Sequence, residues 1–198
     1  RWRYSGEMRI AIIGCGFVAD QYMLTLPLHP ELELVGVMDL LPDRAARFSA
    51  FYGVPAYGSL RELCDDPKVE LVLNLTNPRS HYEVSEACLQ AGKHVYTEKP
   101  LAMKFEEAQA LVKLAAEKGL QLSAAPSRLL GDTAQTMWKA LRSGAIGRVR
   151  LVYAEMDDGM LHKQSYKGWV GASGAPWPLS SMACMVMAVT KMLPAPYW

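Results

Sequence analysis

Two glycines and an acidic residue near the N-terminus could bind a dinucleotide. Gly14 and Gly16 follow a mostly apolar run at 9–13, and a helical stretch separates them from a second apolar run that ends in Asp39. Gly14 permits a tight turn, Gly16 lets the backbone approach a pyrophosphate, and Ala19 is small enough for a helix to pack against a strand. The unpaired N–H groups at the start of that helix, and its positive dipole end, would face the diphosphate.

Asp39 indicates which dinucleotide is bound. It lies about 20 residues after Ala19, where a carboxylate accepts hydrogen bonds from the 2′-hydroxyl of the adenosine ribose and would repel a 2′-phosphate. The sequence therefore favours NAD over NADP. The alternative is a pair of ordinary loop glycines, but the apolar runs on both sides of the motif favour nucleotide binding.

A lysine later in the chain could exchange protons with a substrate. Lys99 lies beside Pro100, in the Glu98-Lys99-Pro100 segment that ends the expected strand at 94–97. Proline restricts the backbone there and can follow a cis peptide bond. An ammonium group in a crevice near a cationic nicotinamide should lose its proton more easily than one in water, which suits exchange with a hydroxyl or carbonyl group. The alternative interpretation of Lys99 is a solvated surface residue.

A regular alternation of strands and helices would position these residues. Strands are expected at 9–13, 34–38, 54–57, 71–75, 94–97 and 120–125, and helices at 42–52, 79–91, 105–116 and 132–143, with a capping box at Ser59 and Glu62 starting a brief helix. Continuous apolar runs are typical of parallel strands covered on both faces. The predicted fold class is therefore α/β, with a doubly wound parallel sheet of the Rossmann type.

Four polar or glycine-rich segments follow the carboxyl ends of these strands. They are 14–19, Asp39, 76–78 and 98–100. In open parallel sheets, ligands bind in the crevice beyond these ends, so the four segments should line one site. Their convergence is a stronger argument for a nucleotide site than any single motif.

Composition points to a small-molecule partner. Among 198 residues, 21 Lys and Arg oppose 20 Asp and Glu, so no strong field is available to bind nucleic acid or an anionic membrane. The four cysteines lack metal-ligand spacing, and no metal site is expected. No apolar run reaches the roughly 18–20 residues that span a bilayer, and 1–7 lack the apolar core of a secretory signal. A cytoplasmic protein is expected.

Taken in order, these motifs resemble the Gfo/Idh/MocA oxidoreductases, the relatives of glucose–fructose oxidoreductase and inositol dehydrogenase. The resemblance extends over about 8–178, and rests on Gly14-Cys15-Gly16-Phe17-Val18-Ala19, Asp39, Thr76-Asn77-Pro78 with His81, Glu98-Lys99-Pro100 and the Gly-Ala-Ile-Gly turn at 144–147. It implies an NAD(P)-binding Rossmann domain and a second α/β domain whose open sheet carries substrate contacts. That sheet often carries subunit contacts too, so a homo-oligomer is possible for a full-length form.

The resemblance also implies roles for single residues. Lys99 would hydrogen-bond the substrate oxygen at the carbon that gives or takes hydride, and Glu98 would position the lysine and the nicotinamide end of the cofactor. His81 opens a helix and is either a cofactor contact or a partly buried polar residue. The candidate catalytic residue is Lys99, and the candidate cofactor-binding residues are Gly14, Cys15, Gly16, Phe17, Val18, Asp39, Thr76, Asn77, Pro78, His81, Glu98, Lys99 and Pro100.

The C-terminal part departs from the family pattern. The expected domains are a dinucleotide-binding domain at 8–125, the start of a substrate and oligomerisation domain at 126–178, entered by a strand at 149–156, and an atypical tail at 179–198. Complete members supply an Asp and, four residues later, a His as general base, and this pair is not found. A fragment with a shifted reading frame or altered end is the favoured hypothesis, and a shortened member that lost the chemistry is the alternative. Sequencing the coding DNA across Pro178 distinguishes them.

The expected function is transfer of a hydride between NAD(P) and a secondary alcohol or ketone of a sugar, cyclitol or similar polyol. The alternative is a catalytically inactive nucleotide-binding protein, acting as a sensor or scaffold, or a non-functional fragment of such an enzyme. A Rossmann methyltransferase is disfavoured because it would not explain Glu98-Lys99-Pro100 at a later strand end.

Overall fold

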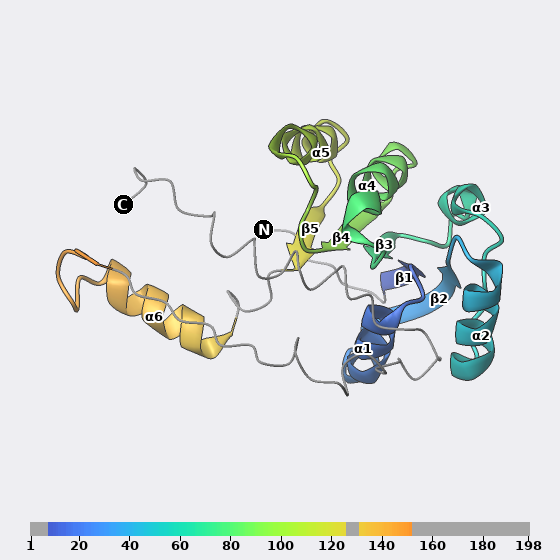
Figure 1. Ribbon diagram of the computed structural model, residues 1–198, viewed down its shortest axis with the longest axis horizontal. Helices are drawn as coiled ribbons and strands as arrows, with labels where there is room; N and C mark the ends of the chain where they lie inside the picture. The colour runs from blue at the N-terminus through green and yellow to red at the C-terminus, as the bar shows by residue number, and fades with distance from the viewer. Residues whose placement is uncertain (1–7, 126–130, 152–198) are drawn as a thin grey trace, which may run out of the picture.

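A five-stranded parallel sheet forms the centre of the protein. The computed structural model describes residues 8–125 and 131–151. The strands are β1 (Met8–Ile13), β2 (Leu32–Met38), β3 (Leu71–Asn74), β4 (His94–Glu98) and β5 (Leu122–Ala125), in the spatial order β2-β1-β3-β4-β5 (Figure 1). All four pairings are parallel, as the α/β prediction requires.

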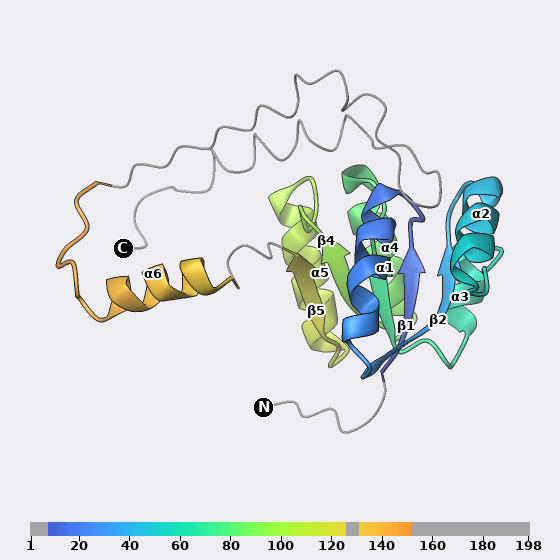
Figure 2. The same ribbon diagram turned by 90° about the horizontal axis from the view of Figure 1, so that it is seen from below.

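Helices cover both faces of this sheet. They are α1 (Phe17–Thr25), α2 (Pro42–Tyr52), α3 (Leu60–Asp65), α4 (His81–Gln90) and α5 (Phe105–Glu117), with short 3-10 helices η1 (Leu26–Leu28) and η2 (Pro78–Ser80). Figures 1 and 2 show α4 and α5 on one face and α1 on the other. The sheet is therefore doubly wound.

The residues of β1 divide between two hydrophobic cores. Ile10 and Ile12 pack with Phe48 of α2 on one face, whereas Ala11 and Ile13 pack with α3, α4 and α5 on the other. These four residues of β1 are each at most 2 % exposed. Because successive side chains of a strand point to opposite faces, a strand covered on both sides must be apolar at every position.

The strand expected at 54–57, along the outer edge of β2, is not formed. Only an isolated parallel bridge joins Val37 to Ala56, with hydrogen bonds from the Val37 N–H to the Pro55 carbonyl (2.9 Å) and from the Tyr57 N–H to the Val37 carbonyl (2.8 Å). Pro55 supplies no N–H of its own, so the ladder stops after these bonds. If Ala56 is counted as a rudimentary strand, the order matches the Rossmann arrangement 3-2-1-4-5-6.

The capping box before α3 also differs in one bond. Ser59 Oγ accepts from the Glu62 N–H (3.1 Å), as expected, but the Glu62 carboxylate accepts from the N–H of Gly58 (2.7 Å), one residue before the cap. The helix α2 is followed by Gly53 in a left-handed conformation (φ 69°), which is typical of the residue just past a helix end.

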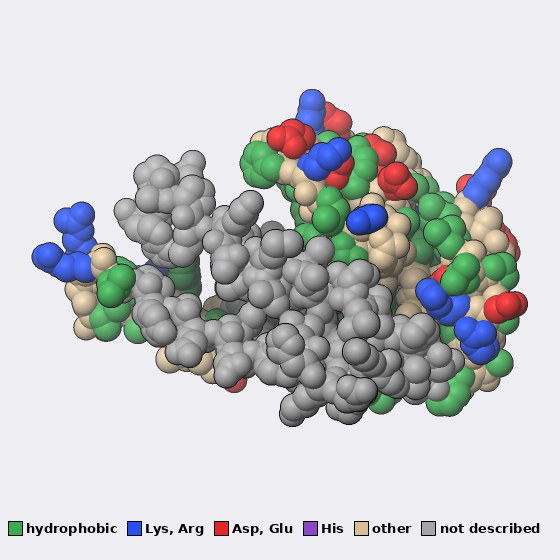
Figure 3. Space-filling model, viewed as in Figure 1, with side chains coloured by type: hydrophobic (Ala, Val, Ile, Leu, Met, Phe, Trp, Pro, Cys, Tyr) green, Lys and Arg blue, Asp and Glu red, His purple; other side chains and the backbone are tan. Residues whose placement is uncertain are grey.

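Residues 131–151 contain α6 (Asp132–Arg142), which Figure 1 shows apart from the sheet. In the helix expected at 132–143, the apolar residues Trp138 and Leu141 suggest an inner face, but Trp138 is 48 % exposed. The expected strand at 149–156 is absent over 149–151, and its remainder, like all of 152–198, lies outside the described residues. No helix in the described ranges is long and apolar enough to cross a membrane. On the face in Figure 3, acidic and basic side chains are intermixed.

Candidate functional site

The turn after β1 can only be made by glycine at its first position. Gly14 has φ 97°, and a Cβ atom there would lie 2.6 Å from the Leu75 carbonyl oxygen and 2.8 Å from the Thr76 nitrogen. Its N–H donates to the Met38 carbonyl at 2.8 Å. The turn is thus packed directly against the carboxyl ends of β2 and β3, which brings three of the expected segments together.

Gly16 serves a different purpose, because the space in front of it is open. It is the residue preceding α1, with φ −91°, and a Cβ atom there would meet nothing within 4 Å. Its backbone conformation is open to any residue, so folding does not require glycine here. The open space lets a phosphate group approach the N–H groups at the start of α1.

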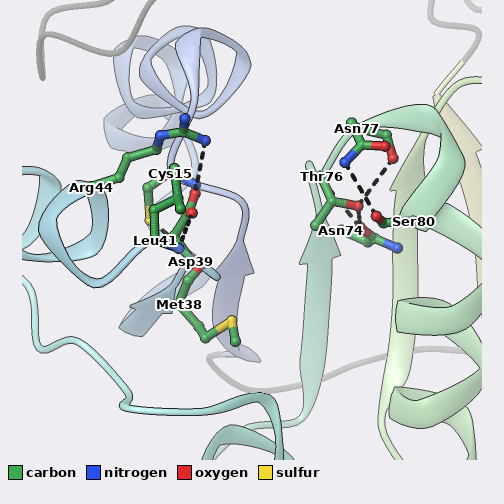
Figure 4. Close-up of polar contacts among 9 residues, drawn as sticks. All are labelled: Cys15, Met38, Asp39, Leu41, Arg44, Asn74, Thr76, Asn77 and Ser80. Carbon is green, nitrogen blue, oxygen red and sulfur yellow. Dashed lines mark hydrogen bonds and ion pairs between the residues drawn. The ribbon is translucent and has the colours of Figure 1, made fainter.

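Asp39 is held at the end of β2 by the glycine turn. Its Oδ2 accepts from the Cys15 N–H (2.9 Å) and its Oδ1 from the Leu41 N–H (2.8 Å), as Figure 4 shows. The Arg44 guanidinium lies 3.5 Å from Oδ2, and the Asp39 side chain is only 6 % exposed. Oδ2 accepts from both Cys15 and Arg44, but Oδ1 has one donor and a second lone pair, so Asp39 remains able to accept a bond from a ribose hydroxyl.

The Cys15 thiol is not suited to chemistry. It is fully buried, and burial, aided by the Asp39 carboxylate, raises its pKa to about 12. The thiol therefore stays neutral near pH 7, and a neutral thiol is a poor nucleophile. The contribution of Cys15 to the site is its backbone N–H, which orients Asp39.

Asn74 shapes the turn after β3. Its Oδ1 accepts from the Thr76 hydroxyl (2.7 Å), while its Nδ2 donates to the His81 carbonyl (3.1 Å) and the Ser85 hydroxyl (3.0 Å). The side chain is completely buried. Asn77 stabilises the same turn, because its Oδ1 accepts from the Arg79 N–H (3.0 Å). The buried Asn74 amide therefore orients Thr76, and the side chain of Asn77 orients its own turn.

Replacing Asn74 by alanine should destabilise the domain by about 2–4 kcal/mol, because it removes the buried hydrogen bonds of the amide to the Thr76 hydroxyl, the His81 carbonyl and the Ser85 hydroxyl. Urea unfolding measured for wild type and variant would give the change in the free energy of unfolding. A loss below about 1 kcal/mol would mean that the network is less important than its burial implies.

His81 connects the ends of two neighbouring strands. Its Nδ1 lies 2.6 Å from the Pro100 carbonyl oxygen and its Nε2 lies 3.1 Å from the Thr76 carbonyl oxygen. The residue is 1 % exposed. Of the two interpretations from sequence, the buried polar residue matches this environment, and its ring contacts backbone on both sides.

A cavity of about 570 Å³ lies at this edge of the sheet, within the usual size range of ligand sites. Of the candidate cofactor-binding residues, those lining it are Gly14, Gly16, Phe17, Val18, Asp39, Thr76 and Asn77. Those not among its lining residues are Cys15, Pro78, His81, Glu98, Lys99 and Pro100. The cavity therefore corresponds to the first three of the four expected segments, and the fourth lies one strand farther along.

Sequence reasoning missed several lining residues, of which Arg44 is chemically the most informative. Its guanidinium faces Asp39, and its Nε is buried without a hydrogen-bond partner among the described residues. The signal is present in the sequence, since Arg44 is a basic residue only five positions after Asp39, in the first turn of the helix expected at 42–52. Further lining residues that were missed are Leu40, Leu41, Ser80 and Glu83.

The fourth expected segment, 98–100, lies at the carboxyl end of β4. Thr97 pairs with Asn74 of β3 in the sheet, so Lys99 follows directly beside the Asn74 turn. Lys99 is partly buried, and the Lys99–Pro100 peptide bond is cis. Glu98 accepts hydrogen bonds from the Tyr22 hydroxyl (2.8 Å) and from the Lys99 N–H (3.2 Å). The described residues contain no group of three side chains that could hold a metal ion.

Comparison with known proteins identifies the family. Residues 8–125 match the Gfo/Idh/MocA family, described as an oxidoreductase family with an NAD-binding Rossmann fold. The chain belongs to this family. It is 30 % identical over 171 residues to trans-1,2-dihydrobenzene-1,2-diol dehydrogenase of Macaca fuscata fuscata, covering 85 % of this chain and 51 % of the relative. The resemblance inferred from the motifs is thus confirmed.

Solved structures agree with this assignment. The WlbA dehydrogenase of Bordetella pertussis, in complex with NADH and UDP-GlcNAcA, has a TM-score of 0.69 and 26 % identity, covering 74 % of this chain and 44 % of that one. Biliverdin reductase of Synechocystis, in complex with biliverdin and NADP+, has a TM-score of 0.63 and 34 % identity, covering 72 % and 45 %. The chain spans about half the length of the curated relatives it matches.

Proposed function

We propose that this chain is the cofactor-binding part of an NAD-dependent dehydrogenase that acts on a secondary alcohol or ketone. The observation that supports it best is one cavity lined by the glycine turn, Asp39 and the Thr76-Asn77 turn, with Lys99 at the neighbouring strand end. These positions suit a dinucleotide whose nicotinamide is directed towards β4. Family membership supports the same reaction class.

Each residue has a separate task in this proposal. The open backbone at Gly16 and the N-terminus of α1 hold the pyrophosphate, and Asp39 accepts from the adenosine ribose. Thr76 and Asn77 line the path towards the nicotinamide, which supplies or accepts the hydride when bound. Lys99 gives a proton to the substrate oxygen during reduction and takes it back during oxidation.

The proposed substrates carry neighbouring hydroxyl groups, as in sugars, cyclitols or other polyols. The diol named for the macaque relative and the sugar derivative bound to WlbA support this class. The residues that would select among such substrates belong to the second domain, which would also provide contacts for a homo-oligomer.

A binding titration and a turnover assay test the proposal on the full chain. When NADH is added, the change in nicotinamide fluorescence should show saturable binding. When a panel of polyols is mixed with NAD+ and the protein, formation of NADH should raise the absorbance at 340 nm. Binding without turnover for any polyol would favour the inactive sensor or scaffold. Absence of binding of either nicotinamide would contradict both functions.

The preference for NAD can be tested at Asp39. In Asp39→Ser the negative charge is lost while Arg44 remains, so the 2′-phosphate of NADPH would meet a guanidinium and no carboxylate. We expect affinity for NADPH to rise at least about tenfold and affinity for NADH to fall, since charge-assisted bonds are worth about 1.5–3 kcal/mol. Isothermal titration with both nucleotides would measure the change.

The double variant Asp39→Ser/Arg44→Ala is the control for this shift. It removes the guanidinium as well, so the gain for NADPH should disappear. If wild type already binds NADPH more tightly than NADH, the assignment of NAD is wrong and Arg44 dominates the charge at this end of the cavity.

A further inference from the structure

One hydrogen bond joins the helix of the glycine turn to the segment that carries Lys99. The Tyr22 hydroxyl, on α1, donates to Glu98 Oε1 at the end of β4 at 2.8 Å, across 76 positions of sequence. The Tyr22 ring contacts Tyr96 edge to face, with centroids 6.4 Å apart. Both ends of the bond thus lie on regular elements, α1 and β4, whose positions are set by the two hydrophobic cores.

The same carboxylate also holds Lys99. Glu98 Oε2 accepts from the Lys99 backbone N–H at 3.2 Å, so each oxygen of Glu98 has a donor. A carboxylate bound at both oxygens is fixed in rotation as well as in position. The orientation of the Lys99 backbone therefore depends on a side chain that Tyr22 orients.

The Tyr22 phenol keeps its proton over the working range of pH. Burial, together with the adjacent Glu98 carboxylate, raises its pKa well above the ordinary value for tyrosine. Tyr22 is therefore a permanent donor to Glu98. A phenol with a raised pKa is a poor acid, which argues against Tyr22 itself passing a proton to substrate.

We propose that Tyr22 is a positioning residue, which through Glu98 fixes Lys99 relative to the helix that would hold the pyrophosphate. α1 begins at the glycine turn, so the Tyr22–Glu98 bond sets the cofactor-binding turn and the lysine in one rigid frame. The effect on catalysis rests on the proposed dehydrogenase function. The effect on the Lys99 backbone does not.

The test compares Tyr22→Phe with a matched tyrosine. Tyr82 also donates to a carboxylate, Glu86 Oε1 at 2.7 Å, but this pair lies within α4 and Glu86 makes no hydrogen bond to Lys99. Both variants lose one hydroxyl and keep the ring. Thermal unfolding of each would establish that the two folds are intact.

Amide hydrogen exchange of Lys99, measured by NMR on the full chain without cofactor, is the first measurement. Tyr22→Phe should exchange about fivefold faster at Lys99, as expected when a bond worth about 1 kcal/mol is lost, and Tyr82→Phe should exchange at the wild-type rate. An unchanged rate at Lys99 in Tyr22→Phe would overturn the proposal, whether or not the protein is an enzyme.

Steady-state kinetics is the second measurement. In Tyr22→Phe, kcat should fall by about tenfold or more while the Kd for NADH changes by less than about threefold, because geometry at the reacting atoms is lost and cofactor binding is kept. Faster exchange at Lys99 with unchanged kcat would overturn the positioning role. Absence of NADH binding in wild type would instead refute the proposed function, and the exchange experiment would still decide whether the bond holds Lys99.

Discussion

Replacing Gly14 by alanine should unfold or severely destabilise the Rossmann domain. Alanine at φ 97° is strained, and its Cβ would lie within 2.8 Å of three backbone atoms of Leu75 and Thr76. Backbone atoms cannot rotate away as a side chain can, so the turn and the end of β3 would have to separate. We expect a loss of about 3–5 kcal/mol in the free energy of unfolding, which urea denaturation would measure.

Gly16→Ala is the matched control for this prediction. Two positions away, the same methyl group would meet no atom within 4 Å, at a φ of −91°. Stability should therefore change by less than about 1 kcal/mol. Affinity for NADH should still fall at least about tenfold, because the methyl group occupies the space through which the pyrophosphate approaches the backbone.

The outcome that would contradict this argument is a stable Gly14→Ala protein. Its stability would mean that the turn adopts another conformation, and the glycine pair would then have no separate roles. Weak NADH binding by both variants, with stability lost only in Gly14→Ala, would support the distinction between a glycine needed for folding and a glycine needed for the ligand.

The site could be predicted from sequence where one residue type has one physical role. Gly14, Gly16 and Asp39 lie at strand ends because apolar runs of four to six residues place those ends, and parallel strands bring them to one edge. The strand at 54–57 was predicted by the same apolar pattern but was wrong, because Pro55 cannot donate to the ladder. Local pattern predicts which residues are extended and does not predict how many of them pair.

Contacts between distant side chains could not be predicted in this way. Tyr22 and Glu98 are separated by 76 positions, and nothing in the spacing of either segment relates one to the other. The two ring contacts of His81 depend likewise on the exact path of the turns after β3 and β4. Arg44 is intermediate, because its closeness to Asp39 in sequence could be predicted but the burial of its Nε could not.

Replacing Lys99 by methionine should abolish turnover while cofactor binding persists. Methionine keeps the unbranched apolar stem and removes the ammonium, so the substrate oxygen loses its proton donor. Proton transfer by a positioned side chain accounts for about 10²–10⁴-fold in rate, and a loss of that size in kcat is expected. The Kd for NADH should change by less than about threefold, since Lys99 does not line the cavity.

Two further variants test whether the loss of kcat in Lys99→Met is due to proton transfer. Lys104→Met removes an exposed ammonium that pairs with Glu107 at 3.3 Å, and kcat should stay within about twofold of wild type because exposed ion pairs contribute little. Lys99→Arg keeps a positive charge that cannot be given up near neutral pH. If Lys99 exchanges a proton, arginine should not restore turnover. If arginine restores it, the charge alone is needed, and another residue must exchange the proton.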